Sequence, residues 1–180
     1  VGLYVDCIPY FEKSAFDFDF AESDRVEVLR GPQGTLYGRN TMGGIINVYT
    51  KSPLKFQGTN ASISNGTYGA REYALSRYAK IGEKFGYSLS ANYNRNDGYF
   101  TNLFTDKKAD DLKSGSGRIR LEWQPTQQWS LGLMSSYDYS KQGGYPYAVC
   151  DSLTHKPGEV NYNDYSFYKR VLSTTGLTAE

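Results

Sequence analysis

Histidine and cysteine are nearly absent from this chain. Its 180 residues include a single histidine, His155, and two cysteines, Cys7 and Cys150, which stand far apart. A Ser–His–Asp triad or a site with several histidine ligands therefore has too few residues to form here. Cys150, Asp151 and His155 lie close in sequence, but one cysteine and one histidine in a polar, aromatic stretch are better explained as solvated loop residues than as metal ligands. We expect no catalytic residue, no metal site and no cofactor.

Long apolar runs and an excess of charge of one sign are also missing. No segment approaches the roughly 18 apolar residues that a membrane-spanning helix requires, so a place in a membrane would require a β-barrel. The 20 basic and 19 acidic residues leave a formal net charge of +1. Because phosphate backbones are bound by clustered Lys and Arg, this balance argues against nucleic acid as a partner.

Glycine and tyrosine, in contrast, are abundant. The chain has 19 Gly and 17 Tyr, and aromatic residues reach 16%, whereas apolar residues make up only 39%. This composition is unusual for a soluble core. It is typical of a transmembrane barrel, in which aromatic residues lie at both membrane interfaces and the lumen is polar.

Many glycines gather between two short β-type apolar runs. Val26 and Val28 precede them, and residues 45–48 follow. The stretch between holds the residues of a candidate structural motif: Arg30, Gly31, Pro32, Gly34, Gly38, Gly43 and Gly44. Glycine at this density predicts a compact, repeatedly turning backbone rather than a helix. We expect these glycines to serve backbone geometry and not to contact a ligand.

The order of residues in this stretch is specific. Residues 26–38, VEVLRGPQGTLYG, followed by residues 42–48, MGGIINV, closely resemble the end of the plug domain of TonB-dependent outer-membrane receptors. Upstream, residues 1–6 resemble a plug strand of that family, which usually continues with glycine where this chain has Cys7. The resemblance by motif covers roughly the first 55 residues.

The resemblance implies an all-β membrane protein, a fragment of an antiparallel transmembrane barrel of about 22 strands that holds a small α+β plug domain. Residues 1–55 would be the C-terminal part of the plug, and residues 56–180 the first six or so barrel strands. The chain would be an internal piece of a longer protein of the bacterial outer membrane. The segment that contacts TonB, with its partners ExbB and ExbD, would precede Val1.

The resemblance also implies a role for two charged residues. Arg30, with Glu27 as a second candidate, would lie at the interface between plug and barrel. Its partners would be barrel carboxylates beyond the end of this chain, because a buried arginine needs such a partner to offset its desolvation.

Beyond Pro53 the sequence alternates between apolar and polar residues. Residues 87–94 show this most clearly, and residues 118–123 alternate between charged and apolar side chains. A period of two predicts strands with one face toward lipid and the other toward a polar, partly charged lumen. The connections alternate in length: short at 82–84 and 125–128, long at 97–116 and 142–168. We therefore expect six strands, with short periplasmic turns and long outer loops.

The second long connection is rich in aromatic residues. Tyr145, Tyr147, Tyr162 and Tyr165 either pack this loop against its neighbours or form part of an external surface that captures a ligand. The sequence leaves both explanations open.

Three functions remain. The first, implied by the resemblance, is TonB-dependent active import of a scarce nutrient, with an iron–siderophore complex as the default ligand and cobalamin, haem or oligosaccharide as alternatives. Its partners would be that small molecule, TonB and outer-membrane lipid. The second is a passive porin or adhesin, against which the plug motif argues. The third is a soluble all-β binding domain, against which the alternating loop lengths argue.

Overall fold

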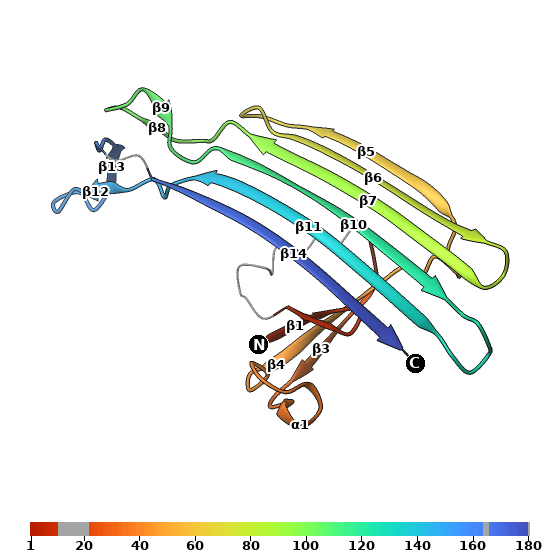
Figure 1. The fold of residues 1–180 in the computed structure, drawn as a ribbon. Coiled ribbons are helices and arrows are strands. Elements are labelled where there is room, and N and C mark those ends of the chain that lie inside the picture. Colours follow the sequence, from red (N-terminus) through yellow and green to blue (C-terminus); the bar gives the residue numbers. More distant parts are fainter. Residues whose placement is uncertain (11–21, 164–165, 180) are drawn as a thin grey trace.

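The computed structural model describes residues 1–10, 22–163 and 166–179, and nearly all of their regular structure is strand. These residues form a four-stranded sheet, a six-stranded sheet and two short hairpins (Figure 1). No helix in these ranges has the length and apolarity that a membrane crossing requires.

The first sheet, called the N-terminal sheet below, is built from residues 2–50. Its order is β2-β1-β4-β3. The strands are β1 (Gly2–Val5), β2 (Ile8–Tyr10), β3 (Ser23–Arg30) and β4 (Gly44–Thr50). β1 pairs in parallel with β4, whereas β2 and β3 pair antiparallel at the two edges. The β-branched residues of β4 suit this central place, and Ile45 and Val48 are buried.

The glycine-rich segment between β3 and β4 contains a short helix, where the sequence predicted none. α1 (Gly34–Tyr37) is a single turn. Such a turn depends on tertiary contacts. The ring of Tyr37 meets that of Tyr4 edge-on at 5.1 Å between centroids, and Asn47 donates a hydrogen bond to the Tyr37 hydroxyl at 3.2 Å. On either side of α1 the backbone turns as the glycines predict, with positive φ at Gly31, Gly38 and Gly44.

The second sheet, called the six-stranded sheet, is an antiparallel meander. Its strands are β5 (Gly58–Asn65), β6 (Arg71–Ile81), β7 (Phe85–Asn96), β10 (Leu112–Trp123), β11 (Leu131–Gly143) and β14 (Phe167–Ala179). The registers between neighbouring strands run without a bulge. Odd-numbered residues therefore share one face of the sheet and even-numbered residues the other.

The long connections are shorter than predicted, because strand pairing extends into them. β10 begins at Leu112, inside the predicted loop 97–116, and β14 begins at Phe167, inside the predicted loop 142–168. Backbone pairing needs no apolar side chain, so polar residues continue these strands. The rest forms two hairpins: β8 (Thr101–Asn102) with β9 (Lys107–Lys108), and β12 (Ala148–Cys150) with β13 (Pro157–Val160). Both hairpins lie at one end of the sheet, and the short turns that join β6 to β7 and β10 to β11 lie at the other (Figure 1).

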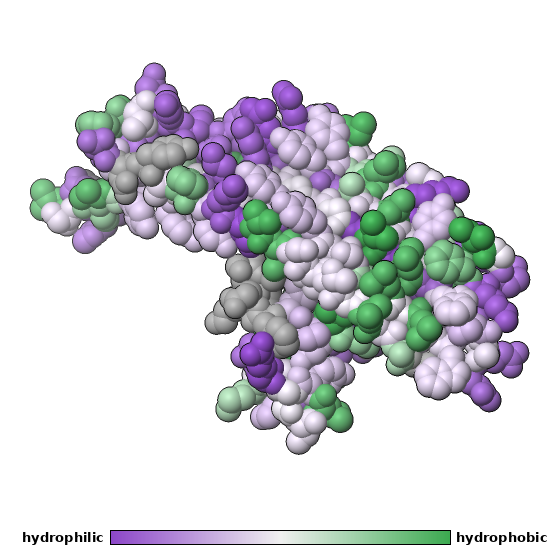
Figure 2. All heavy atoms as spheres, viewed as in Figure 1, coloured by the Kyte–Doolittle hydropathy of each residue, from purple (hydrophilic) through white to green (hydrophobic). Residues whose placement is uncertain are grey.

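The two faces of the six-stranded sheet differ in chemistry. Odd-numbered residues such as Leu75, Leu89 and Ile119 are apolar and exposed. Figure 2 shows hydrophobic residues gathered toward the short-turn end of the sheet and hydrophilic residues toward the hairpins. The even-numbered face is polar, and it arches over the N-terminal sheet (Figure 1). A small apolar core joins the two sheets there, formed by Leu3, Val5, Tyr10 and Val48 with Met134 of β11.

Candidate functional site: a polar seam and a tyrosine cluster

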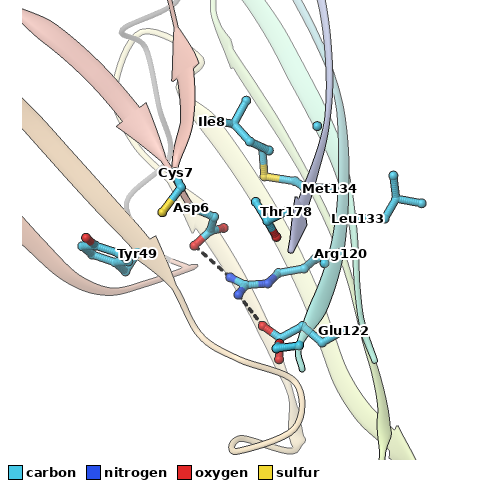
Figure 3. A pocket seen from close by; sticks show the side chains of 12 residues that line it. Asp6, Cys7, Ile8, Tyr49, Arg120, Glu122, Leu133, Met134 and Thr178 are labelled. Carbon is cyan, nitrogen blue, oxygen red and sulfur yellow. Dashed lines mark hydrogen bonds and ion pairs between the residues drawn. The ribbon is translucent and has the colours of Figure 1, made fainter. Parts of the chain in front are cut away.

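The N-terminal sheet is joined to the six-stranded sheet by ionised side chains. Arg120 of β10 points inward, and its Nη1 lies 2.8 Å from Oδ1 of Asp6 in the turn between β1 and β2. Its Nη2 pairs with Oε1 of Glu122, two residues along the same face. Figure 3 shows Arg120 reaching between these two carboxylates, which come from different sheets. The arginine thereby links the two sheets.

Hydroxyl and backbone groups near the end of β4 complete this cluster. The backbone N–H and the hydroxyl of Thr50 donate to the Asp6 carboxylate at 2.8 and 2.7 Å. The Ser52 hydroxyl donates to Glu122. The side chains of Arg120, Asp6 and Glu122 are only 17%, 11% and 11% exposed. Charges so far removed from water are tolerated because each has a charged partner and further hydrogen bonds.

A second ion pair between the sheets involves Arg118, which lies two residues before Arg120 on β10. Arg118 Nη1 lies 3.0 Å from Oε2 of Glu22, which immediately precedes β3. Both side chains are largely buried. Together the two clusters form a line of charge between the sheets, called the ion-pair seam: Asp6, Glu22, Arg118, Arg120 and Glu122.

Packing along the seam is incomplete. A cavity of about 130 Å³ lies beside it, between the β1–β2 turn and the inner face of the six-stranded sheet. Its lining includes Asp6, Cys7, Tyr49, Arg120 and Met134. The contact between the sheets is therefore partly polar and partly open, unlike the close-packed interior of a single domain.

The turn that presents Asp6 to Arg120 has an unusual backbone. Asp6 and Cys7 are its two central residues, with φ of 47° and 65°. Positive φ at both positions is typical of a type I′ hairpin turn, which favours Asn or Asp followed by Gly. Cysteine lacks this freedom because its Cβ crowds the backbone in the left-handed region. Cys7 stands where the family usually has glycine. It therefore lies in the same turn as Asp6, which pairs with Arg120 in the ion-pair seam.

The two interface candidates from the sequence lie elsewhere. Arg30 ends β3, opposite Gly44 in the register, and is exposed. Glu27 accepts a hydrogen bond from Nε of Arg25 at 2.8 Å. Among the described residues neither forms an ion pair with the six-stranded sheet. Their pairing with carboxylates beyond the end of this chain stays a prediction.

The sequence did contain a signal for the seam. Residues 118, 120 and 122 were expected to line a charged lumen, but no partner was assigned to them. Three charges on one inward face require partners to offset desolvation, so opposite charges on the N-terminal sheet had to be sought. Asp6 and Glu22 carried no pattern of their own and were missed.

Three of the four candidate ligand-binding tyrosines come together at the hairpin end. The rings of Tyr145 and Tyr147 lie 6.5 Å apart between centroids, and those of Tyr147 and Tyr162 lie 6.3 Å apart. The Tyr162 hydroxyl donates to the carbonyl oxygen of Tyr145 at 3.2 Å. Tyr145 and Tyr147 are 72% and 66% exposed. Tyr165 lies outside the described residues. These three residues are called the tyrosine cluster below.

A buried asparagine ties the cluster to the other long loop. Asn102, at 3% exposure, donates from Nδ2 to the carbonyl oxygen of Tyr162 at 2.9 Å and accepts from the Tyr162 N–H at 3.2 Å. A backbone hydrogen bond from Leu103 to Val160 lies beside it. Sequence reasoning missed Asn102 because one asparagine in a polar loop has no distinguishing pattern.

The loop carboxylate Asp151 is used by its own turn. It accepts hydrogen bonds from the backbone N–H groups of Leu153 and Thr154 at 2.8 and 3.2 Å. These hydrogen bonds hold the pKa of Asp151 below its ordinary value. In the part of the chain that the structure describes, no group of three or more His, Cys, Asp or Glu side chains is placed to hold a metal ion.

Known proteins resemble this chain both in the plug-domain motif and in the wider sequence. Residues 1–45 match the family model of the TonB-dependent receptor plug domain. The chain is 31% identical over 150 residues to the pesticin receptor of Yersinia pestis, which covers 78% of this chain. It is 33% identical over 125 residues to the vitamin B12 transporter BtuB of Vibrio cholerae, which covers 66% of this chain. The chain spans about a fifth of the length of these relatives, 21% and 20%.

Solved structures share the fold. The ferric yersiniabactin uptake receptor FyuA from Yersinia pestis superposes with a TM-score of 0.75 at 23% identity, over 99% of this chain and 29% of that one. The ferripyoverdine receptor of Pseudomonas aeruginosa, bound to ferripyoverdine, gives a TM-score of 0.75 at 18% identity, over 99% of this chain and 25% of that one. At these identities the likeness shows the fold alone. The plug-domain match, the sequence relatives and the shared two-sheet fold together show that this chain belongs to the TonB-dependent receptors of the bacterial outer membrane.

Proposed function

We propose that the receptor to which this chain belongs imports a scarce nutrient actively, with an iron–siderophore complex as its ligand and TonB, ExbB and ExbD as the source of energy. One observation carries the proposal: the N-terminal sheet lies against the polar inner face of the six-stranded sheet and is held there by the ion-pair seam. An element in that position obstructs the lumen of a barrel. A passive porin or an adhesin has no need of it.

In this proposal residues 1–55 are the end of the plug, and residues 56–180 are the first strands of the barrel wall. The composition of the seam suits a joint that opens. Ionised and hydroxyl groups exchange protein partners for water, whereas apolar surfaces lose free energy when water enters between them. TonB acts through a segment outside this chain, and ligand binding at the outer end biases the plug toward the state that TonB engages.

We assign the ligand to the siderophores because receptors for siderophores are among the proteins that this chain resembles. The pesticin receptor is a sequence relative, and the structural neighbours include an uptake receptor for ferric yersiniabactin and a receptor bound to ferripyoverdine. Cobalamin is the second candidate, because a vitamin B12 transporter is 33% identical to this chain. Haem and oligosaccharides follow from the family alone.

Within the proposed receptor the tyrosine cluster, together with Tyr165, is part of the outer ligand surface. Exposed aromatic rings held by a buried hydrogen bond to Asn102 offer flat, amphipathic contact area at low entropic cost. The double variant Y145A/Y147A should weaken ligand binding at least about tenfold. Tyr68 and Tyr99, a second exposed pair with centroids 4.7 Å apart, provide the control Y68A/Y99A. Equal affinity in the two double variants would remove the cluster from the ligand surface.

The proposed function is tested by separating binding from uptake. Cells of the source bacterium with and without the intact gene are starved of iron and given a panel of siderophores loaded with radioactive iron, with labelled cobalamin in parallel. We expect one ligand to lose uptake with the gene. An uncoupler should then abolish its uptake and leave its binding unchanged. Uptake that persists in de-energised cells contradicts active import, whereas loss of cobalamin uptake alone changes only the cargo.

A further inference from the structure

A buried side chain joins the two long connections of the six-stranded sheet. Asn102 lies on β8, in the first of them, and is 3% exposed. Its Nδ2 donates to the carbonyl oxygen of Tyr162, in the second connection, at 2.9 Å, and its Oδ1 accepts from the Tyr162 N–H at 3.2 Å. The side-chain amide thus makes the pair of hydrogen bonds that a facing residue of an antiparallel strand would make.

A backbone hydrogen bond extends this contact. The N–H of Leu103, which follows β8, donates to the carbonyl oxygen of Val160, the last residue of β13, at 2.9 Å. The β8–β9 hairpin is therefore joined to the β12–β13 hairpin at the end of the sheet where both lie (Figure 1). We call the two contacts, Asn102 with Tyr162 and Leu103 with Val160, the loop bridge.

The amide of Asn102 is fixed from its own side as well. Its Oδ1 also accepts from the N–H of Phe104 at 3.0 Å, and its backbone carbonyl oxygen accepts from the N–H of Asp106 at 2.8 Å. Two N–H groups point to the oxygen of the amide and one carbonyl oxygen to its nitrogen, so only one orientation satisfies all three. Leucine has nearly the same shape as asparagine and none of these polar groups.

The contact continues from the loop bridge to the exposed rings. The Tyr162 hydroxyl donates to the carbonyl oxygen of Tyr145, and the Tyr162 ring lies 6.3 Å from that of Tyr147. Tyr162 is half-buried, whereas Tyr145 and Tyr147 are exposed. The positions of the two exposed rings therefore depend on Tyr162, and the position of Tyr162 depends on Asn102.

The loop bridge is separate from the pairing that holds the sheet. Below it, the N–H of Gly143 donates to the carbonyl oxygen of Asp111 at 2.7 Å, and the unbroken registers of β10, β11 and β14 begin. A change at Asn102 should therefore release the two loops and leave the sheet intact. Exposed rings on a released loop must be ordered again when a ligand binds, and this ordering lowers affinity.

We propose that Asn102 is a positioning residue for ligand binding. From the neighbouring loop it holds the tyrosine cluster, through Tyr162, in the arrangement that the ligand requires. This inference rests on the proposed function, in which the cluster is part of the outer ligand surface. Asn102 is buried and acts without touching the ligand. Because coupling between two sites is reciprocal, a ligand on the cluster also orders the β8–β9 hairpin.

The test uses the full-length receptor and the variant N102L. Its matched control is N161L, which changes an exposed asparagine beside Tyr162. The probes are the siderophores loaded with radioactive iron and the labelled cobalamin of the uptake panel. De-energised cells give the affinity and the number of binding sites, and energised cells give the half-saturating concentration and the maximal rate of uptake. Hydrogen exchange is measured on the purified receptor with and without the probe that binds.

Without a probe, we expect the amides of Leu103, Phe104 and Tyr162 to exchange at least about tenfold faster in N102L, with no change in β10 and β11. The affinity should fall and the half-saturating concentration should rise, each about tenfold, because two rings must be ordered on binding. The number of sites and the maximal rate should equal those of the wild type. A defect in folding would lower these two quantities instead.

The bound probe should slow exchange of Leu103 and Phe104 in the wild type and in N161L, but not in N102L. Y162F removes only the hydroxyl that reaches Tyr145 and keeps the loop bridge. We expect it to weaken binding about threefold, without faster exchange at Leu103. The double variant N102L/Y162F should bind no more weakly than N102L, because both changes interrupt one series of contacts.

Four results would overturn the positioning role: wild-type affinity in N102L, unchanged exchange of Tyr162 in N102L, a loss of binding sites at unchanged half-saturation, or an equal effect of N161L. A failure of the proposed ligand surface looks different. Y145A/Y147A would then bind the probe as the wild type does, while N102L would still loosen both loops. In that case the loop bridge exists, but it positions no ligand contact.

Discussion

Gly44 is the residue of the glycine-rich motif whose side chain the fold excludes. Its φ is 112°, and a Cβ placed there would lie 2.4 Å from the carbonyl oxygen of Leu29 on the paired strand. Gly34, which begins α1, has no positive φ, and its Cβ would meet only Thr41 Oγ1 at 3.9 Å. The fold therefore requires glycine at position 44 but leaves room for a side chain at position 34.

Substitution by valine should separate these two glycines. We expect G44V to destabilise the N-terminal sheet by at least about 2 kcal/mol, through a strained backbone and a clash within the sheet. G34V should cost under about 1 kcal/mol, the loss of helix propensity in a single turn. Hydrogen exchange of the β3 and β4 amides in the full-length receptor measures both. Similar protection in the two variants would show that the conformation of Gly44 is not required.

Cys7 is the residue at which this chain departs from the family pattern. It occupies the left-handed region, at a φ of 65°, where glycine is free of steric cost. The variant C7G should stabilise the N-terminal sheet by about 1 kcal/mol. C7A, which removes the thiol and keeps the Cβ, should give no gain. If C7A stabilised the sheet as much as C7G, the thiol and not the backbone would be the source of the strain.

Among the elements, the ion-pair seam holds the two sheets together. Breaking a buried ion pair leaves an uncompensated charge and costs about 3–5 kcal/mol. We expect R120M and D6N each to loosen the N-terminal sheet by an amount of this order. The double variant should fall short of their sum, with a coupling of roughly 1–3 kcal/mol. These effects are measured by chemical denaturation of the full-length receptor and its variants, monitored by hydrogen exchange of the amides in the N-terminal sheet. The wild type, the two single variants and the double variant form a double-mutant cycle.

The control for the seam is an exposed pair in the same sheet. Lys80 Nζ lies 3.0 Å from Oε2 of Glu83, whose side chain is 86% exposed. E83Q should change stability by less than about 0.5 kcal/mol, because solvent screens such pairs. Additive effects of R120M and D6N, or an effect of E83Q as large as theirs, would mean that the seam is not a coupled unit.

The class and the faces of the strands could be predicted from the sequence, but the strand ends and the helix α1 could not. The all-β class and the alternating faces were predictable, because a period of two leaves a clear pattern at residues 87–94 of β7 and 118–123 of β10. The ends of those strands were not, since polar residues such as Lys113 pair their backbones without any apolar signal. The helix α1 was missed because contacts of Tyr37 with Tyr4 and Asn47 stabilise it, and both of these residues lie outside the glycine-rich segment.

For the whole molecule, the features that matter arise from register and from contact between sheets. Arg71, Arg95, Lys113, Lys141 and Lys169 lie in one row only because four registers align residues that are 18 to 28 positions apart. The seam exists only because Asp6 and Glu22 meet strand β10, about 100 positions later. Neither spacing is a motif, so composition and local pattern left both unseen.

We propose that the N-terminal sheet separates from the six-stranded sheet during import. Cγ1 of Ile8 lies 2.5 Å from the position that a Cβ at Gly176 would take. One further C–C bond places the two Cβ atoms within the separation a disulfide requires, about 3.5–4.5 Å. The variant I8C/G176C, in a receptor with Cys7→Gly and Cys150→Ser, therefore allows the two sheets to be locked together. The control S135C/T175C links β11 to β14 within the wall, where the hydroxyls lie 2.9 Å apart.

The decisive measurement is uptake of the labelled ligand by energised cells, before and after reduction of each disulfide. We predict that oxidised I8C/G176C binds the ligand normally, fails to take it up, and recovers uptake on reduction, whereas the control imports in both states. Undiminished uptake by the oxidised, fully cross-linked I8C/G176C receptor would contradict the account, because the sheets would then remain joined at this contact throughout import.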